Sequence, residues 1–553
     1  MLKPALDVLS GQVLFRDSFT QYGALSTYLQ SLALWVSPSL LSIRIMTVAS
    51  YAVTLILLYA VWRMILPRSL TIIACLLFIL FIPTYELQFW DGDYWKLLPW
   101  SSVYAMVFQS MAIYALFQMI QSGQSRKWAS ILGFACACVL WTRQPVGIIM
   151  FGCLCVIWPM LLWSGWKPTG ESRRSAGLRI LAWFLALNLL MVAQLLMTGA
   201  WSDWWYQNVV WPSRWSDSVG SFYVIKMFIH VGTGAGLLAL LIAGALPSLL
   251  RKFRPALSTR TVVAYFLCLA LVLAWQHDWL LHVINLRAGG WSAVFPLVIL
   301  AQSGFCIYST IYKRDAGKTS EFYLTATLAG FSLGSLLQFY PLADPWHIIW
   351  SLAPAFGLII YTIWRWLRWP AWAVAIGLSL AFLPAAWAKY RTASNMRNQP
   401  LVTLQEPVAL RGMRLSPANA AMYQQIVAAL RPVLKQQPDI TSALIGKDAI
   451  FLCFTDNLEN PSPYFVTWGG LTDGPKEVER WNYIHGQRPI LFFHMALWAE
   501  VGKFYQRSHY TPILYIPELA LEIAIPAELA KTIGIDVYGA SPNAVPNLET
   551  KAP

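Results

Sequence analysis

Long apolar runs separated by short polar stretches make up the chain from residue 40 to residue 388. About 20 predominantly apolar residues are enough for a helix to cross a bilayer. The pattern therefore predicts about twelve membrane-spanning helices. Their expected ranges are 40–62, 70–84, 98–120, 128–145, 146–166, 178–199, 223–250, 260–277, 291–312, 321–340, 347–366 and 370–388.

The polar loops between these runs alternate in character. Loops rich in Lys and Arg lie on the cytoplasmic side of a membrane protein. The alternate loops contain Trp, Tyr, His and Asp instead, so they are expected outside, together with the N-terminal segment and the C-terminal region. The expected location is a bacterial inner (cell) membrane, crossed many times. The basic loops contain Arg63 and Arg68; Arg126 and Lys127; Lys167, Arg173, Arg174 and Arg179; Arg251, Lys252, Arg254 and Arg260; Lys313, Arg314 and Lys318; Arg365 and Arg368.

The composition changes near Tyr390, where the apolar runs give way to ordinary globular sequence. The expected fold is an α-helical polytopic membrane protein with a small C-terminal α/β domain outside the cytoplasm. The expected divisions are 1–39 (outer loop and amphipathic helix), 40–389 (transmembrane domain), 390–537 (soluble periplasmic α/β domain) and 538–553 (disordered tail).

Several local patterns outside the apolar runs predict particular elements. Residues 24–35 (A-L-S-T-Y-L-Q-S-L-A-L-W) alternate as expected of an amphipathic helix that lies along the membrane surface. Residues 416–434 also indicate an amphipathic helix, capped by Ser416 with Pro417 in its first turn. The apolar runs 449–454 and 489–493 indicate buried strands.

Composition supports the membrane class. The 553 residues are 57% hydrophobic and 12% charged, whereas soluble proteins contain roughly 25% charged residues. The net charge of +14 does not indicate a nucleic-acid partner, because the basic residues fall in short loops between apolar runs. Seven of the eight cysteines lie in apolar segments and are expected to be small buried hydrophobic residues.

The first polar segment, Gly11–Gly23, contains one carboxylate, Asp17, between Arg16 and Phe19. An acidic group beside a membrane suggests a functional role. A solvated loop carboxylate, or a partner for Arg16, is an equally good interpretation from chemistry alone.

The second outer loop contains F-W-D-G-D-Y-W-K, in which Asp91, Asp93 and Lys96 are flanked by Trp90 and Trp95. Aromatic rings stack on the apolar faces of sugars while carboxylates bind hydroxyls, so the loop is a candidate sugar site. An interfacial aromatic belt explains the same residues equally well. The two carboxylates could also contribute to a Mg²⁺ or Mn²⁺ site.

Arg143, in W-T-R-Q-P, ends an apolar run on the side where Arg is scarce. It is a candidate ligand for a phosphate, which a guanidinium binds in bidentate fashion, or a residue that reaches toward the headgroups. Asp344 and His347 lie at the outer end of a late run, and Arg287 lies in an earlier outer loop. The segment 201–217 packs five Trp around three charged residues, and headgroup contact is favoured for it over sugar stacking.

Several of these segments resemble GT-C glycosyltransferases, integral membrane enzymes that use polyprenyl-phosphate sugars. The resemblance rests on G-Q-V-L-F-R-D-S-F-T-Q-Y-G-A-L-S-T-Y-L, on Arg44 in S-L-L-S-I-R-I-M, on W-T-R-Q-P-V-G-I and on A-D-P-W-H-I-I-W-S-L-A-P. It covers roughly residues 8–390. The combination of many spans and an outer C-terminal domain is similar to that of protein mannosyltransferases and lipid A aminoarabinose transferases.

The resemblance implies an inverting transfer from a polyprenyl-phosphate sugar to a lipid, glycan or protein acceptor, with Asp17 as general base. Arg143, with His347 or Arg287, would stabilise the leaving phosphate. A metal would not be required, although Mg²⁺ or Mn²⁺ is compatible with the chemistry. Members of the family begin with a spanning helix before the Asp loop, whereas only sixteen residues precede Asp17 here. A shortened N-terminus or misassigned start is therefore expected.

Other functions are compatible with a polytopic chain of this composition. A transporter or flippase of lipid-linked glycans would place charged residues within spans and break helices at the midplane, and the sequence shows few of either. An O-antigen ligase or polymerase would use a diphosphate-linked donor. A non-catalytic membrane scaffold is the remaining alternative.

Overall fold

The computed structural model describes most of the N-terminal third and most of the C-terminal region. The described residues are 2–82, 100–121, 125–163, 166, 172–213, 320–335, 350–351, 353–367, 369–398, 400–445, 449–455, 474–495 and 509–535, with six isolated positions between 261 and 272. The expected spans 223–250 and 291–312, and two-thirds of 260–277, lie outside this part of the chain.

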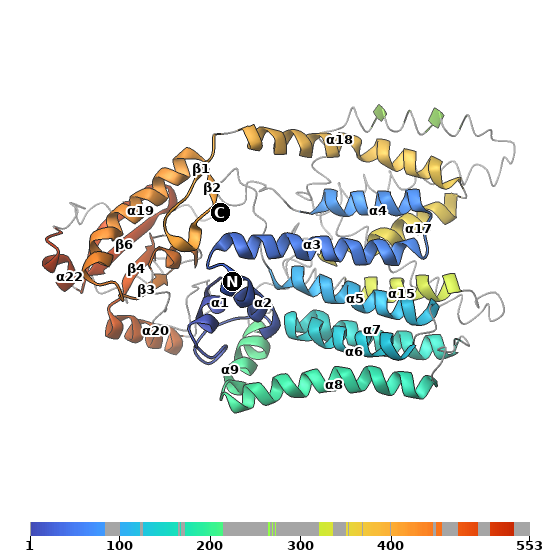
Figure 1. Ribbon diagram of the computed structural model, residues 1–553, viewed down its shortest axis with the longest axis horizontal. Coiled ribbons are helices and arrows are strands. Elements are labelled where there is room, and N and C mark those ends of the chain that lie inside the picture. Colours follow the sequence, from blue (N-terminus) through green and yellow to red (C-terminus); the bar gives the residue numbers. More distant parts are fainter. Residues whose placement is uncertain are drawn as a thin grey trace.

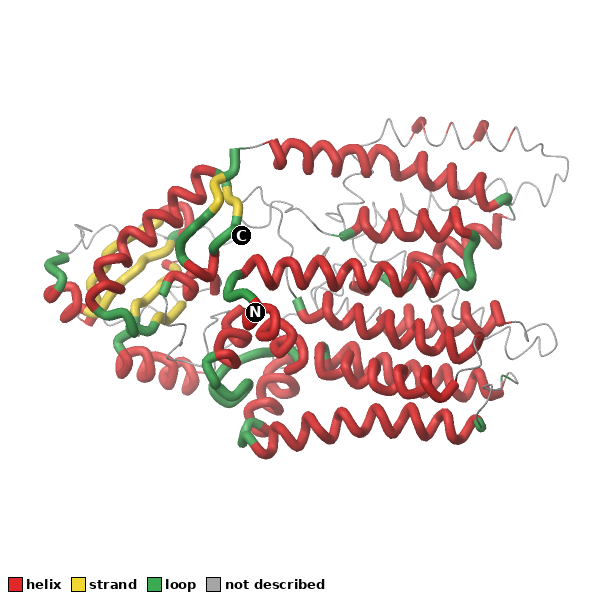
Figure 2. Tube along the Cα trace, viewed as in Figure 1, coloured by secondary structure: helices red, strands yellow, loops and turns green. Residues whose placement is uncertain are grey.

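Roughly parallel and antiparallel helices form a bundle, with a mixed sheet at one end of it (Figures 1 and 2). Within the described residues, four helices are long and apolar enough to cross a membrane: α3, α5, α7 and α8. The bundle helices are α3 (Leu40–Arg63), α4 (Arg68–Phe81), α5 (Ser101–Gln121), α6 (Ser125–Thr142), α7 (Gln144–Trp163), α8 (Arg173–Met197), α15 (Ser320–Ser335), α17 (Ala355–Leu367) and α18 (Ala371–Asn398).

Helix α8 shows why the chain is a membrane protein. It lies at the edge of the bundle (Figure 1), and only 17% of its most apolar window is buried. Leu189, Leu190 and Met197 are each more than three-fifths exposed. An apolar surface of this extent is stable against lipid and costly against water. The coarse prediction of a helical membrane protein is confirmed, whereas the number of spans is not tested.

Two short helices gather at the end of the bundle that faces the sheet (Figure 1). They are α1 (Leu2–Leu9) and α2 (Ala24–Val36). The expected helix at 24–35 is present. Its polar side chains are buried and its apolar ones partly exposed, the opposite of a surface helix in a soluble protein. Ser26, Thr27, Gln30 and Ser31 are buried, whereas Trp35 is 74% exposed. The polar face of α2 therefore points into the protein.

The C-terminal region contains a four-stranded sheet in the order β3-β4-β6-β5. Strand β3 runs parallel to β4, and β6 is antiparallel to both β4 and β5. A small two-stranded sheet, β1 with β2, precedes it. The strands are β1 (Val402–Thr403), β2 (Arg414–Leu415), β3 (Ser442–Ile445), β4 (Ile490–His494), β5 (Tyr510–Ile516) and β6 (Leu521–Pro526).

Both faces of the four-stranded sheet are covered, because successive side chains of a strand point to opposite faces. In β4, Phe492 packs in the cluster that includes α19 (Pro417–Gln436), whereas Phe493 packs against Trp481 of α20 (Gly474–Gln487). Figure 1 shows α19 and α20 on opposite sides of the sheet. The short helix α22 (Ala527–Thr532) follows β6.

Two details of this region agree with the sequence patterns and one does not. Ser416 caps α19 by accepting from the Asn419 N–H at 3.3 Å, and the run 489–493 forms β4. The run 449–454 is wrong as a strand: it forms the 3-10 helix η4 (Ala449–Phe454). Four consecutive side chains there, Phe451 to Phe454, are buried, and a short, uniformly apolar run does not distinguish strand from helix.

The sheet region contacts the bundle at the start of α3. Ser39 Oγ donates to the Arg411 carbonyl at 2.9 Å. Gly412, with φ +83°, lies close to Leu41, and Leu40 packs against the core of the sheet region. Helix α18 continues through Tyr390 to Asn398, so the boundary drawn from composition at 389/390 falls inside a helix.

Candidate active site

The segment that contains Asp17 forms a tight loop between α1 and α2. Phe15 adopts φ +72°, and it is almost fully buried. A left-handed conformation costs a non-glycine residue about 1–3 kcal/mol and persists where the surroundings determine it. The Phe15 N–H donates to the Ser18 carbonyl at 3.0 Å, and the Asp17 N–H donates to the Val13 carbonyl at 2.9 Å. The backbone around Asp17 is therefore fixed on both sides.

Asp17 and Arg16 form a two-point ion pair. Arg16 Nε lies 2.8 Å from Asp17 Oδ1, and Arg16 Nη2 lies 3.0 Å from Oδ2. The hydrogen bond from Arg16 lowers the pKa of Asp17 below its ordinary value; partial burial opposes this, and a 2.7 Å bond from the Val13 N–H reinforces it. The carboxylate is 32% exposed, so it is ionised and accessible.

Arg16 also connects this loop to α8. Its Nη1 donates to the Thr198 carbonyl at 3.1 Å, and the charge of Asp203 also acts on it. A second acidic residue, Asp7 of α1, is buried and accepts a hydrogen bond from the Ser18 hydroxyl. Charged residues from three segments therefore meet around the loop.

The far end of the loop is attached to the junction of α6 and α7. The Gly23 N–H donates to the Thr142 carbonyl at 3.2 Å. A Cβ on Gly23 would lie 2.0 Å from the Trp141 carbonyl oxygen, so the backbones touch. Arg143 is the next residue along that junction, and the Asp17 loop and Arg143 are thus held at the same end of the bundle.

Arg143 lies where α6 stops and α7 starts. Pro145 lacks an N–H, which suits the first turn of a new helix because that N–H would have no partner within the helix. The guanidinium donates to the Ser102 hydroxyl at the start of α5. It also lies over the ring of Trp350, 5.7 Å from the centroid. A part-buried cation at the end of three helices can bind an anionic group.

A helix that follows α8 completes the surroundings of the loop. It consists of α9 (Trp201–Trp205) and a π-helical turn, η1 (Tyr206–Val210). Gln207 on this turn accepts from the Thr20 N–H at 2.9 Å and donates to the Phe15 carbonyl at 2.7 Å. Asn208 accepts from Gln144 Nε2, at the start of α7, at 2.7 Å. Adjacent residues of one turn thus hold the loop and the helix that follows Arg143.

Aromatic side chains surround the same region. The rings of Trp201 and Trp204 stack with centroids 5.2 Å apart, and Trp204 also contacts Trp141 at 5.6 Å. Phe19 meets Trp211 edge-on at 5.6 Å. The Trp-rich segment, expected as an outer loop, is helical up to residue 213. Trp201 and Trp205 remain exposed beside the loop, where rings can contact either a sugar or the headgroups.

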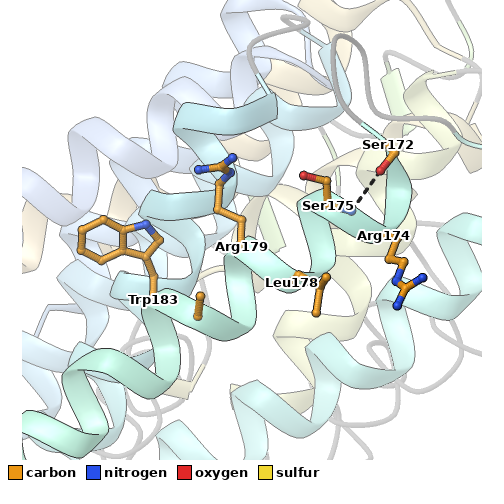
Figure 3. A pocket seen from close by; sticks show the side chains of 7 residues that line it. Ser172, Arg174, Ser175, Leu178, Arg179 and Trp183 are labelled. Carbon is orange, nitrogen blue, oxygen red and sulfur yellow. Dashed lines mark hydrogen bonds between the residues drawn. The ribbon is translucent and has the colours of Figure 1, made fainter.

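A pocket at the opposite end of α8 is separate from this site. It is lined by Ser172, Arg174, Ser175, Leu178, Arg179, Ala182 and Trp183 (Figure 3). Ser172 caps α8 by accepting from the Ser175 N–H at 3.1 Å. A helix of this length spans about 37 Å at 1.5 Å per residue, so the pocket lies far from Thr198 and Asp17.

Three of the nine candidate residues fall in the described part of the chain, and the structure brings them to one end of the bundle: Arg16, Asp17 and Arg143. No group of three His, Cys, Asp or Glu side chains suited to a metal occurs among the described residues. The other six candidates, Asp91, Asp93, Lys96, Arg287, Asp344 and His347, lie outside the described residues.

Sequence reasoning missed Asp7 and Gln207. Asp7 lies six residues from the chain start, in a helix too short to give a periodic signal. Gln207 lies in a Trp-rich segment, and its partners are 187 and 192 residues away. No local sequence pattern predicts a contact between segments so far apart in the chain.

Comparisons with solved structures find similar chains that include an oligosaccharyltransferase and ArnT. The oligosaccharyltransferase of Archaeoglobus fulgidus, solved in complex with Zn and sulfate, matches with a TM-score of 0.45 and 12% identity over 93% of this chain and 68% of that one. ArnT from Cupriavidus metallidurans, bound to undecaprenyl phosphate, matches with a TM-score of 0.43 and 12% identity over 96% of this chain and 93% of that one.

No family model matches the sequence, and no curated protein matches it. The two proteins are thus an oligosaccharyltransferase and ArnT, each 12% identical to this chain.

Proposed function

We propose that this protein is an inverting glycosyltransferase of the GT-C class. It moves a sugar from a polyprenyl-phosphate donor to a hydroxyl of a cell-envelope lipid, glycan or protein. The reaction takes place at the outer face of a bacterial inner membrane. The observation that carries the proposal is the accessible, ionised Asp17 carboxylate, fixed in a loop at the end of an apolar bundle whose helix junction carries Arg143.

In the proposed reaction, Asp17 accepts the proton of the acceptor hydroxyl as that oxygen attacks the anomeric carbon. The bond between the anomeric carbon and the phosphate oxygen breaks on the opposite side, so the configuration inverts. A carboxylate of lowered pKa is a weak base toward a free alcohol. It becomes effective as the new C–O bond forms, because the hydroxyl then becomes acidic.

The leaving group is a polyprenyl phosphate, whose negative charge increases as the bond breaks. Arg143 is part-buried and oriented by Ser102 and Trp350, so it can stabilise that charge without reorganising. A monophosphate needs less compensation than a diphosphate. The proposed reaction therefore requires no divalent cation, and transfer is expected to persist in the presence of a chelator.

The assignment of the proposed reaction to the outer face of the membrane rests on the Lys- and Arg-rich loops. Arg63 and Arg68 join α3 to α4 at one end of the bundle, and the loop of Asp17 is joined to the opposite end through α2. The positive-inside rule assigns the first end to the cytoplasm. Asp17, α9 and the sheet region then face outward, where lipid-linked sugars are consumed.

The test is transfer by the purified protein in lipid bilayers, with a panel of polyprenyl-phosphate sugars and Asp17→Asn as the variant. We expect the variant to lose about 10²- to 10⁴-fold in kcat, the usual effect of losing a general base, and to accumulate in the membrane normally. Asp439→Asn, at an exposed position before β3, is the matched control and should keep full activity.

Three outcomes would overturn the proposal. Full transfer by Asp17→Asn would show that Asp17 is not the general base. Dependence on a diphosphate-linked donor would indicate a ligase or polymerase. Movement of lipid-linked glycans across vesicles without a new glycosidic bond would indicate a transporter.

A further inference from the structure

We propose that Gln207, on the π-helical turn η1, is the positioning residue for the catalytic loop. It fixes the direction of the Asp17 carboxylate without touching it. This inference rests on the proposed function of Asp17, although the contact itself can be tested without any sugar substrate.

The geometry of Gln207 fits this role. Its carbonyl oxygen accepts from the Thr20 N–H at 2.9 Å, and its amide nitrogen donates to the Phe15 carbonyl at 2.7 Å. One side chain therefore holds the backbone two residues before and three residues after Asp17. Gln207 is only 1% exposed, so water does not compete for either bond.

The bond to Phe15 falls at the strained point of the loop. Phe15 has φ +72°, a conformation that a bulky residue adopts only when its surroundings determine it. The Phe15 carbonyl belongs to the peptide group that joins Phe15 to Arg16. Its orientation therefore determines where Arg16 and Asp17 point. Without the Gln207 amide, the buried Phe15 carbonyl loses this hydrogen bond, which favours relaxation of the loop.

The π turn explains how Gln207 reaches the loop. The Trp211 N–H bonds to the Tyr206 carbonyl, five residues earlier, so the turn contains one residue more than an α-helix would. The additional residue changes the directions in which the side chains of this turn point. Gln207 then meets the loop backbone, Asn208 meets Gln144, and Trp211 packs edge-on against Phe19. Such turns occur often at functional sites.

The other bonds of the loop are local, lie at its end, or run through an exposed side chain; the local ones join Val13 to Asp17 and Phe15 to Ser18. Gly23 is held by the Thr142 carbonyl, and Ser18 bonds to Asp7 within the same N-terminal segment. Arg16 reaches the Thr198 carbonyl, but through a flexible, half-exposed side chain. Among the described residues, Gln207 supplies the buried side-chain bonds that bracket Asp17 on both sides.

The experiment compares Gln207→Ala with Gln194→Ala. Gln194 is a matched control, because it also bonds between helices, to the Tyr28 hydroxyl, but not to the loop. We expect Gln207→Ala to lower kcat by about 10- to 100-fold, the effect of misplacing a reacting group by about 1 Å. Donor KM should change by less than about threefold, because donor binding does not use Asp17. The acidic limb of the pH–rate profile should shift, because the ion pair of Asp17 is no longer aligned.

Hydrogen exchange provides the readout that needs no substrate. The amides of residues 11–22 should exchange at least about tenfold faster in Gln207→Ala, and as in the wild type in Gln194→Ala. If Gln207→Ala does not accumulate, Gln207→Glu is measured instead. Its ionised carboxylate can accept from Thr20 but cannot donate to Phe15, so at alkaline pH it should show the same changes.

The outcomes separate this inference from the proposed function. Wild-type exchange in residues 11–22 of the Gln207 variants, or equal effects in Gln194→Ala, overturns the positioning role. A kcat loss accompanied only by lower thermal stability, with the pH profile unmoved, also overturns it. If the wild-type protein transfers no sugar from any donor, the proposed function fails, while the exchange data still decide whether Gln207 holds the loop.

Discussion

Arg and Trp side chains lie at both ends of helix α8, from the helix itself at the first end and from Arg16 and α9 at the second, yet the two ends are built differently. At Ser172 the hydrogen bond is local, from Ser175 to the capping hydroxyl, in a pocket on the surface of one helix. At Thr198 the helix meets Arg16, which is 182 residues away in sequence and paired with Asp17. The difference is in the long-range bonds and not in the residue types.

The comparison shows how a candidate site is to be recognised in a membrane protein. Basic and aromatic residues collect at any helix end near the headgroups, for reasons of solvation alone. A site that does chemistry also needs its groups held in place. Only the Thr198 end, among the described residues of α8, combines an accessible carboxylate with backbone contacts from α1, α6 and η1.

The largest expected effect comes from breaking the contact between the loop and the α6–α7 junction. In Gly23→Ala, the new Cβ would lie 2.0 Å from the Trp141 carbonyl oxygen, so the loop must move. The φ of Gly23 is −62°, so the effect is steric and not conformational. We expect transfer to fall by about 100-fold or more, measured as kcat/KM in bilayers.

Gly152→Ala is the matched control for that change. A Cβ at Gly152 in α7 meets nothing within 4 Å. Alanine in a helix interior is about 0.5–1 kcal/mol more favourable than glycine, so the control should be fully active and equally or more stable to heat. Equal loss of activity in both variants would show that the loop contact is not special.

Removing the cation at the helix junction should have the next largest effect. Arg143→Ala loses a guanidinium fixed by Ser102 and Trp350, and we expect kcat/KM to fall by about 10- to 100-fold. Arg143→Lys keeps the charge but not the planar fork, so it should recover part of the loss. Wild-type kinetics in both variants would mean that the leaving phosphate is bound elsewhere.

A smaller effect, visible in the pH dependence, is expected from Arg16→Gln. Arg16 holds the pKa of Asp17 below its ordinary value. Without Arg16 that pKa should rise, so the acidic limb of kcat/KM should move to higher pH while activity at pH 8 is largely kept. The stabilising contribution of the pair has the same sign: it is present above the unfolded-state pKa and is lost as pH falls through the folded-state pKa. An unmoved acidic limb would contradict the assignment of Asp17 as the titrating base.

The smallest effect is expected at the other end of α8. The double substitution Arg174→Gln and Arg179→Gln changes the pocket in Figure 3 but nothing at Thr198. Transfer by the purified protein in bilayers should change by less than about twofold, because sites distant from the reaction act independently of it. A loss comparable to that of Arg143→Ala would erase the distinction between the two ends.

Much of the helical framework could be predicted from the sequence, because apolar length is a strong signal. The expected spans 40–62, 98–120 and 146–166 correspond to α3, α5 and α7 within a few residues. The cap at Ser416 was equally clear, since its hydrogen bond is local. Such signals are contained in a few consecutive residues.

What the sequence did not reveal depends on contacts between distant segments. The periodicity of residues 24–35 indicated a helix but not that Gln30 and Ser31 would face inward. Whether the apolar face of an amphipathic helix turns toward lipid or toward the protein depends on which solvent surrounds it. Likewise, the sequence indicates both Asp17 and Arg143 as candidates, but their placement at one end of the bundle comes from the Gly23–Thr142 contact.

The distance along the chain between Asp17 and Gln207 also affects when the site is completed during synthesis. Thr20 is 187 residues earlier than its partner, and a ribosome that adds about 5–20 residues per second needs roughly 10–40 s to cover that distance. Throughout that interval the nascent chain has its acidic loop but not the side chain that holds it. Chains released before residue 207 would therefore enter the membrane with the loop unclamped.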